Sequence, residues 1–252
     1  MLPRRRDPIN VGARGYNQYG SAWVSSQLAR FLFEHLTPAA KLEIQKRRMA
    51  TLQGQMLTSS GVEPARTGQG LTIGMHIRRG DSCHMHRYCP GNLTTSYFAA
   101  AVRLRDKYGA NNLLLATDDR EAARLCLAGH LGFRCRTQAI ERGKFEATEL
   151  IENRVAQHEA GELSGSAVAL DALADIEMLA DADMFVMLLR SCFARVAYAL
   201  ALGRKGRPPP IISLEAPWSP YKGAKRRKGG RKGIRSRGGA YHKRAFGPAQ
   251  SI

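Results

Sequence analysis

Short apolar runs and longer amphipathic segments alternate through most of this chain. Five runs have strand length, and they lie at residues 71–77, 113–117, 133–137, 184–188 and 211–214. The segments between them have the apolar spacing of helices. Strands that alternate with helices are typical of an α/β fold, so the pattern predicts a Rossmann-like parallel sheet with helices on both faces.

The helices are predicted from their apolar spacing and from the residues that begin or end them. Ser21 can cap a helix over residues 22–36, and Thr37 followed by Pro38 predicts a second helix that continues to residue 52. Asp119 and Ser191 are expected caps further along. Within the strand-rich part, helices are predicted at 94–108, 119–130 and 191–202, and residues 144–180 are helical in composition.

Composition divides the chain into four segments. Residues 1–20 look irregular, residues 21–70 form a helical segment with a turn-rich linker, and residues 71–218 contain the predicted sheet. Residues 219–252 hold eleven Lys or Arg residues and no Asp or Glu, against a formal charge of +18 for the whole chain. This Gly-rich basic segment has few large apolar residues to offset its ordering entropy, so we expect it to be disordered.

The five cysteines and the lack of long apolar stretches limit the classes of protein. An odd number of cysteines cannot all pair within one chain, but Cys83 and Cys89 are close enough to pair across a loop. Alternatively, Cys83, His84, His86 and Cys89 could bind zinc, although their spacing matches no common zinc finger. No stretch approaches the roughly 18–20 apolar residues that span a bilayer, and no signal peptide is expected.

Polar residues follow three of the predicted strands at the edge where open parallel sheets bind ligands. The first strand leads into the sequence HIRRGD at residues 76–81, the second is followed by Asp118 and Asp119, and the fourth by Arg190 and Ser191. Adjacent guanidinium groups bind phosphate in a bidentate way, and a helix that begins at Ser191 offers free N–H groups to an anion. A diphosphate ligand fits both features.

Each of these residues also has a purely structural interpretation. One of Arg78 and Arg79 could pair with Asp81, Ser191 and the pair Asp118-Asp119 could be helix caps, and His76 could be a satisfied core histidine. The sequence contains no GxxxxGK[ST] loop and no GxGxxG after a strand, so ordinary P-loop and dinucleotide sites are excluded.

Four segments resemble one family in the right order. IGMHIRRGDSC (73–83), LLLATDD (113–119) and DIEMLADADMFVMLLRSCFARVAY (175–198) resemble the three motifs of the fucosyltransferases, and AWVSSQLARFL (22–32) is similar to the helix that precedes them in the alpha-1,6-fucosyltransferases. The resemblance covers about residues 20–202. Members of this family fucosylate the core GlcNAc of N-glycans or chitooligosaccharides.

The resemblance implies the donor-binding half of a two-domain GT-B glycosyltransferase. It implies GDP-fucose as donor, a glycan or glycoprotein acceptor, inversion at the sugar carbon, and no metal or other cofactor. Arg78 would hold the donor's β-phosphate, Ser191 its diphosphate, and His76 and Asp175 the guanine or ribose. Supporting positions near the reacting atoms are Arg79, Asp81, Asp118 and Asp119.

This sequence departs from the family pattern in several places. No Asp or Glu lies between Asp81 and Asp106, where the family places a carboxylate base, so His86 or His84 is the candidate base here. Arg190 stands where the family has a small hydroxyl residue, and it adds charge beside the diphosphate or obstructs it. Most of the family's first domain is absent upstream of residue 20, and the basic tail replaces the family's downstream region.

Three functions are therefore considered. The first is an active fucosyltransferase, which the resemblance would place in the Golgi lumen although the sequence has no signal or anchor. The second is a truncated or non-catalytic GDP-sugar-binding protein. The third is a protein that binds nucleic acid or another polyanion through residues 219–252, a property that any such basic segment has at low salt.

Overall fold

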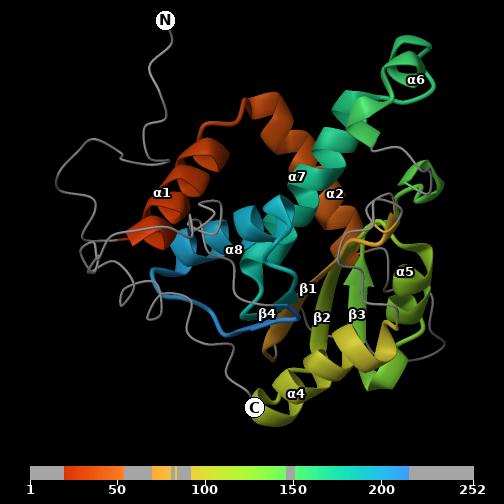
Figure 1. The fold of residues 1–252 in the computed structure, drawn as a ribbon. Coiled ribbons are helices and arrows are strands. Elements are labelled where there is room, and N and C mark those ends of the chain that lie inside the picture. Colours follow the sequence, from red (N-terminus) through yellow and green to blue (C-terminus); the bar gives the residue numbers. More distant parts are fainter. Residues whose placement is uncertain (1–19, 54–69, 81–82, 84–91, 146–150, 216–252) are drawn as a thin grey trace, which may run out of the picture.

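A computed structural model describes residues 20–53, 70–80, 83, 92–145 and 151–215. Within them, five parallel strands form one sheet in the order β3-β2-β1-β4-β5 (Figure 1). This is the order of a Rossmann-type sheet, in which the chain reverses direction across the sheet between β1 and β4. The predicted parallel α/β fold is thus confirmed for the described residues.

All five strands lie where the apolar runs predict them. Their bounds are Thr72–Ile77 (β1), Asn112–Thr117 (β2), Arg134–Thr137 (β3), Met184–Met187 (β4) and Ile211–Ser213 (β5). β1 is central: Ile73 lies opposite Leu113 of β2 on one side and opposite Met184 of β4 on the other. The carboxyl ends of all strands therefore lie along the same edge of the sheet.

The helices cover both faces of the sheet. Their bounds are Gly20–Glu34 (α1), Pro38–Gln53 (α2), Ala99–Tyr108 (α4), Arg120–Leu127 (α5), Val155–Glu159 (α6), Gly165–Asp181 (α7) and Cys192–Lys205 (α8). α4 and α5 pack on one face, and α7 and α8 on the other. The right-handed crossover rule requires this, because the chain moves in opposite directions across the sheet before and after β3.

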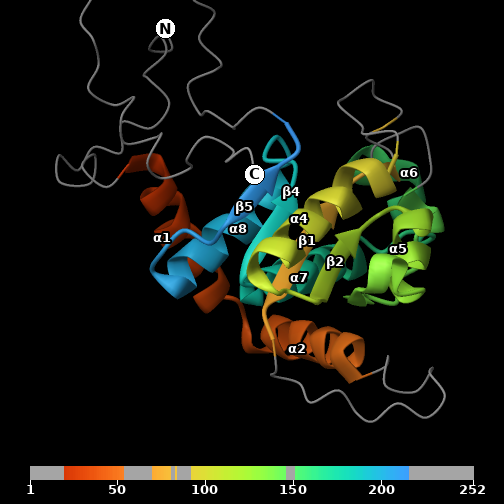
Figure 2. The ribbon, with the colours of Figure 1, turned by 90° about the horizontal axis from the view of Figure 1, so that it is seen from below.

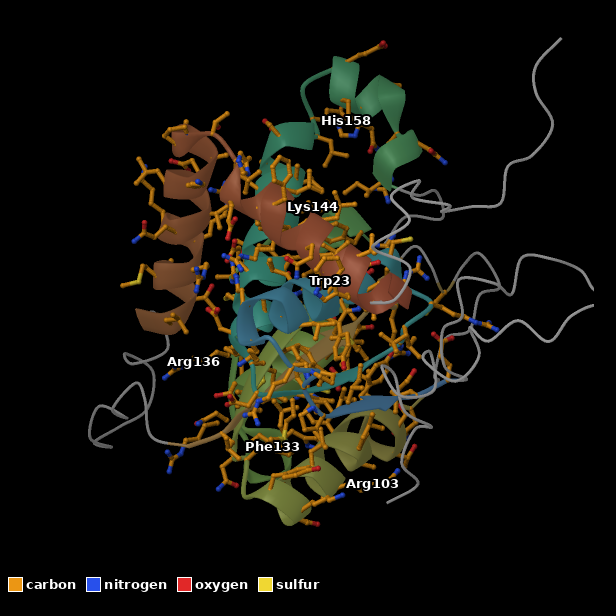
Figure 3. All side chains as sticks on the ribbon, turned by 90° about the vertical axis from the view of Figure 1, so that its left-hand side faces the viewer. Trp23, Arg103, Phe133, Arg136, Lys144 and His158 are labelled. Atoms are coloured by element: carbon orange, nitrogen blue, oxygen red, sulfur yellow. A yellow bond between two sulfur atoms is a disulfide. The ribbon has the colours of Figure 1, made fainter. Side chains whose placement is uncertain are left out.

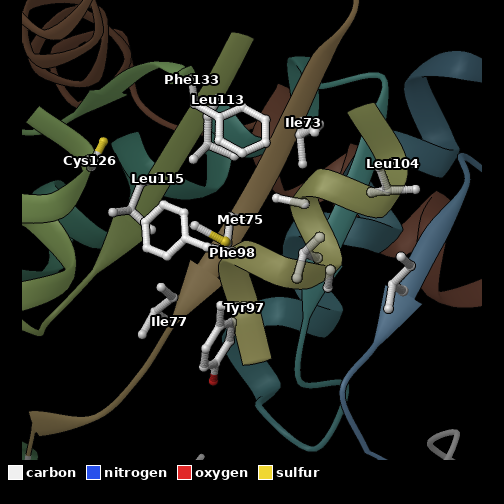
Figure 4. Packing of buried hydrophobic residues seen from close by; sticks show 14 of the residues in the cluster. Ile73, Met75, Ile77, Tyr97, Phe98, Leu104, Leu113, Leu115, Cys126 and Phe133 are labelled. Atoms are coloured by element: carbon white, nitrogen blue, oxygen red, sulfur yellow. The ribbon is translucent and has the colours of Figure 1, made fainter. Parts of the chain in front are cut away.

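Two apolar clusters fix these layers. Figure 4 shows the cluster under α4 and α5, in which Ile73 and Met75 of β1 meet Phe98, Leu113 and Phe133. Each fully buried side chain of this kind stabilises the fold by roughly 1.5–3 kcal/mol. Since Ile73, Met75 and Ile77 face this cluster, the alternate residue His76 faces the side of α7 and α8.

α1 and α2 pack outside α8 and α7, in different ways (Figure 2). α1 lies so close to α8 that a Cβ on Gly203 would meet the Ser26 carbonyl oxygen at 2.7 Å. α2 is bound to α7 by ion pairs, including Arg47 Nε to Asp171 Oδ1 at 3.0 Å. Lys144 reaches the same Asp171, with Nζ 3.1 Å from Oδ2 (Figure 3).

One helix prediction needs correction, and the residues of helical composition at 144–180 are divided among separate helices. The helix that begins after Asp119 ends at Leu127, because Gly129 adopts a left-handed conformation (φ 66°) and a short 3₁₀ turn follows at His130–Gly132. Residues 144–180 do not form one helix. Gly161 (φ 74°) separates the short α6 from α7, and His158, labelled in Figure 3, bonds the carbonyl groups of Ile151 and Leu163 across this break.

Three of the four cysteines within the described residues are in disulfides. A disulfide joins Cys126 of α5 to Cys135 of β3, a pairing that the sequence did not indicate. Cys83 is also disulfide-bonded, so its sulfur is not a thiolate ligand for zinc. Cys192 is free and exposed.

Several expectations lie outside the described residues. They concern Asp81, His84, His86, Cys89, the segments 1–19 and 54–69, and the basic segment 219–252. Among the residues that are described, no helix is both long and apolar enough to cross a bilayer.

Candidate functional site

Polar side chains form a row along the carboxyl edge of the sheet. Following the strand order, Gln138 and Arg142 come after β3, Asp118 and Asp119 after β2, Arg78 and Arg79 after β1, Arg190 and Ser191 after β4, and Glu215 after β5. In open sheets of this order, ligands bind at the switch point, which here lies between β1 and β4.

Asp118 organises the exits of β1 and β2. Its Oδ1 accepts a hydrogen bond from the backbone N–H of Arg79 at 2.7 Å, and its Oδ2 lies 3.9 Å from Nη1 of Arg78. Gly80 is required here, since a Cβ would meet the Phe145 carbonyl oxygen at 2.7 Å. The turn after β1 is therefore tied to β2, and the Arg78 side chain remains 32% exposed beside it.

Asp119 is the helix cap that its place in the sequence predicted. Its side chain caps α5 by accepting from the N–H of Ala122 at 2.7 Å. Arg79 approaches the same carboxylate, with Nη1 3.6 Å from Oδ2. Asp119 thus combines a cap with an ion pair, and both contacts hold it within the scaffold.

Arg142, a residue that the sequence analysis missed, joins the ends of β2 and β3. Its guanidinium group is buried and donates to Thr117 O at 3.3 Å, Thr137 Oγ1 at 2.9 Å and Gln138 O at 2.7 Å. Gln138 in turn donates to Oδ1 of Asp175 at 2.6 Å. We call this group (Asp118, Asp119, Gln138, Arg142 and Asp175) the β2–β3 side.

Asp175 of α7 is an acid whose protonation depends on its burial. Burial raises its pKa to about 7, opposed by the hydrogen bond from Gln138 and the charge of Arg142. The hydrogen bond from Gln138 ties Asp175 to the residues that follow β3.

His76 occupies the face of β1 toward α8. Its ring stacks on Phe193 with centroids 4.6 Å apart and planes 18° apart. Only 6% of the residue is exposed, and burial, together with the charge of Arg78, lowers the pKa of His76 to about 3. The ring is therefore neutral, and its buried Nδ1 has no hydrogen-bond partner within the described residues.

The N-terminus of α8 lies beside this histidine. Ser191 caps the helix, with Oγ accepting from the N–H of Ala194 at 3.4 Å. The amides of Cys192 and Phe193 precede Ala194 in the first turn, and an α-helix provides no acceptor for such groups. We call this group (His76, Ser191, Cys192 and Phe193, with Arg78 at its border) the β1–β4 side.

Arg190 neither charges nor obstructs this helix terminus in the way expected from the sequence. Its guanidinium Nε lies 3.0 Å from Oε2 of Glu215, while its backbone N–H donates to Oε1 of the same residue. The Glu215 side chain is 4% exposed and that of Arg190 is 71% exposed. The charge of Arg190 is thus directed toward the end of β5.

The structure brings together some of the sequence-predicted residues. Arg78, Arg79, Asp118 and Asp119 form one contact group, His76 stacks on Phe193 in the first turn of the helix that Ser191 caps, and Asp175 bonds to Gln138 after β3. Missed residues are Gln138, Arg142, Phe193 and Glu215. Arg142 could have been found from its position five residues after a predicted strand. Phe193 and Glu215 could not, because they act through contacts with elements that are distant in the sequence.

The fold and this edge define a Rossmann-type α/β protein with a polar switch point. In comparisons with protein-family models and with curated proteins, no match to this chain was found. No group of three His, Cys, Asp or Glu residues suited to a metal ion occurs in the described part of the chain.

Proposed function

We propose that this chain binds GDP-fucose at the β1–β4 side and transfers fucose to a GlcNAc-containing glycan. The observation that carries the proposal is the conjunction of His76 with the N-terminus of α8. His76, whose buried Nδ1 has no hydrogen-bond partner among the described residues, stacks on Phe193 in the first turn of α8, at the switch point of the sheet. Such groups acquire partners when a nucleoside diphosphate binds there.

The charges around the switch point also favour a diphosphate. The Arg78 side chain is 32% exposed at the exit of β1, and guanidinium groups bind phosphate in a bidentate way. His76 is neutral at physiological pH, so it suits a hydrogen bond to the nucleoside better than a charge contact with phosphate. The resemblance also assigns a nucleoside contact to Asp175; since Oδ1 already accepts from Gln138, we assign Asp175 a supporting role.

The proposed reaction is a single displacement with inversion. The acceptor hydroxyl oxygen attacks the anomeric carbon of fucose, the bond from that carbon to the diphosphate oxygen breaks, and GDP leaves with the bonding electrons. The hydroxyl proton goes to a base, for which His86 is the candidate and His84 the alternative. Arg78 and the α8 amides would offset the charge that grows on the leaving group, and removing such a contact typically costs about 10²–10³ in rate.

The finer assignments follow from the resemblance and remain part of the proposal. They are the donor-binding half of a GT-B enzyme, catalysis without a metal or other cofactor, and residence in the Golgi lumen. The Cys126–Cys135 disulfide supports an oxidising compartment, since disulfides are rare in the cytosol.

The test is a GDP titration followed by a transfer assay. GDP should raise the melting temperature, because a ligand at 100 times its Kd stabilises by about 2.7 kcal/mol. His76→Leu should weaken GDP binding without lowering the free energy of unfolding, because it removes a buried polar atom that has no partner. Arg78→Met should weaken it as well, and the matched control is Arg134→Met on the exposed surface of β3.

Transfer is then measured with GDP-fucose and N-glycan or chitooligosaccharide acceptors. Fucosylated product is expected with the wild-type chain and far less with Arg78→Met. GDP binding without transfer or donor hydrolysis would leave a non-catalytic GDP-sugar-binding protein. The proposal is overturned altogether if GDP leaves the melting temperature of the wild-type chain unchanged.

A further inference from the structure

The turn between β4 and α8 is held from two sides. Residues 188–191 form a turn in which the N–H of Ser191 donates to Leu188 O at 3.0 Å. From the helix, Arg195 Nη1 donates to Leu189 O at 3.3 Å and to Arg190 O at 3.4 Å. From β5, Glu215 accepts from the backbone N–H of Arg190 and pairs with its side chain.

Glu215 is placed to do this by the sheet itself. β5 pairs with β4 through Met187 and Ser213, and the N–H of Leu214 donates to Met187 O at 3.2 Å. The next residue is Glu215, whose side chain is almost fully covered: Oε1 accepts a hydrogen bond from the Arg190 amide, while Oε2 lies 3.0 Å from Arg190 Nε as an ion pair without a hydrogen bond among the described residues. One carboxylate thus fixes both the backbone and the charge of the residue that precedes the Ser191 cap.

We propose that Glu215 is a positioning residue for the diphosphate subsite, acting through Arg190. It sets the direction of the first amides of α8, and it neutralises Arg190 so that the subsite consists of helix amides and Arg78. This inference rests on the proposed function. The inference adds to the proposed function a residue after β5 that acts without touching the ligand. It also gives a reason why arginine is tolerated at position 190.

The two roles of Glu215 predict different outcomes for different variants. Glu215→Gln keeps an acceptor for the Arg190 amide, so GDP affinity should stay within about threefold of wild type. Glu215→Ala removes both contacts, and loss of such a supporting contact should weaken GDP binding roughly tenfold. Arg190→Met leaves a buried carboxylate unpaired beside an anionic ligand, so GDP binding should weaken at least as much.

The double variant Arg190→Met/Glu215→Gln is the decisive measurement. It removes the uncompensated charge and keeps the amide acceptor, so GDP affinity should recover toward wild type. The inference would be overturned if GDP affinity did not recover in the double variant and only followed the stability of each variant. Wild-type GDP affinity in Glu215→Ala would also overturn it. The control is Glu141→Ala, a carboxylate that is 76% exposed and pairs with Arg120.

A second readout does not depend on GDP. Cys192 is a free, exposed thiol in the first turn of α8, and Arg195 Nη2 donates to its Sγ at 2.9 Å. Its alkylation rate by iodoacetamide, measured by peptide mapping, should change in Glu215→Ala and stay near wild type in Glu215→Gln. If wild type does not bind GDP but the thiol responds as expected, the proposed function fails while Glu215 still positions α8; an unchanged thiol rate in Glu215→Ala refutes the positioning role itself.

Discussion

The β2–β3 side and the β1–β4 side lie at the same edge of the sheet, but they differ in how far their polar groups bond to one another. On the β2–β3 side, Arg142 makes hydrogen bonds to three strand-end groups, and Gln138 bonds to Asp175. On the β1–β4 side, His76 stacks on the first turn of α8, and its buried Nδ1 has no hydrogen-bond partner in the part of the chain that the structure describes.

This difference separates scaffold from binding site. Buried polar groups in native proteins are almost always paired, and each exception calls for an explanation. A saturated group has few bonds left to give to a ligand, whereas an unsatisfied group gains one when a ligand arrives. The comparison therefore assigns stability to the β2–β3 side and ligand binding to the β1–β4 side, and three measurements can break or sharpen it.

The largest expected effect is on Arg142. Arg142→Met takes away the guanidinium donor to the buried acceptors Thr117 O and Gln138 O and the positive charge that favours the Asp175 carboxylate. Removing one partner of such a buried network costs about 3–5 kcal/mol in the free energy of unfolding. Urea denaturation monitors this loss, and GDP affinity of the folded variant should change much less.

Two variants control the Arg142 measurement. Arg134→Met removes an exposed arginine from β3, the strand that precedes Arg142, and should change the free energy of unfolding by no more than about 0.5 kcal/mol. Arg142→Lys keeps the charge and some of the donors, so it stays measurable if Arg142→Met does not fold. The assignment of the β2–β3 side to the scaffold is wrong if Arg142→Lys is as stable as wild type but loses GDP binding.

The contrast between the two sides also explains which parts of the fold were predictable. The strands follow from local apolar runs, and Asp119 and Ser191 cap helices as their sequence positions allowed. A cap involves residues three positions apart, so a local pattern is sufficient to find it. The parallel sheet then follows from the alternation of elements.

The partners of the site residues could not be predicted in this way. Gln138 bonds to Asp175 across 37 positions of sequence, and Arg190 bonds to Glu215 across 25. Whether His76 is satisfied depends on which atoms surround it in three dimensions, so the sequence left open a satisfied core histidine. The structure shows that His76 is in the core and that no described residue forms a hydrogen bond with its Nδ1. The family resemblance and the GT-B assignment stay predictions.

The second prediction uses the opposite pKa shifts of the two sides. Asp175 has an ordinary pKa of 3.8 and a folded pKa of about 7, so between these values the folded state binds more protons and the free energy of unfolding falls as pH rises. His76 has an ordinary pKa of 6.5 and a folded pKa of about 3, so in that interval the unfolded state binds more protons and stability rises with pH.

The two slopes oppose each other between about pH 4 and 6.5, and each reaches at most about 1.4 kcal/mol per pH unit. Asp175→Asn should leave the rise of the free energy of unfolding with pH that His76 causes, and His76→Leu should leave the fall that Asp175 causes. Urea denaturation from pH 4 to 8 measures both, taken as differences from wild type so that other carboxylates cancel. Two difference curves that are flat over this range would show that neither group is held in the protonation state assigned here.

The smallest expected effect compares two helix caps, one from each side. Asp119→Ala removes the 2.7 Å bond to Ala122 and an ion pair with Arg79, and it should cost about 1–2 kcal/mol in the free energy of unfolding. Ser191→Ala removes a longer bond of 3.4 Å to Ala194 and should cost about 0.5 kcal/mol.

GDP affinity should respond in the reverse order, because Ser191 lies at the helix terminus that meets the diphosphate. Calorimetric titration with GDP and urea denaturation of the same two variants measure both quantities. If Asp119→Ala weakens GDP binding more than Ser191→Ala does, then the ligand lies at the carboxyl end of β2 and the two sides have been assigned the wrong roles.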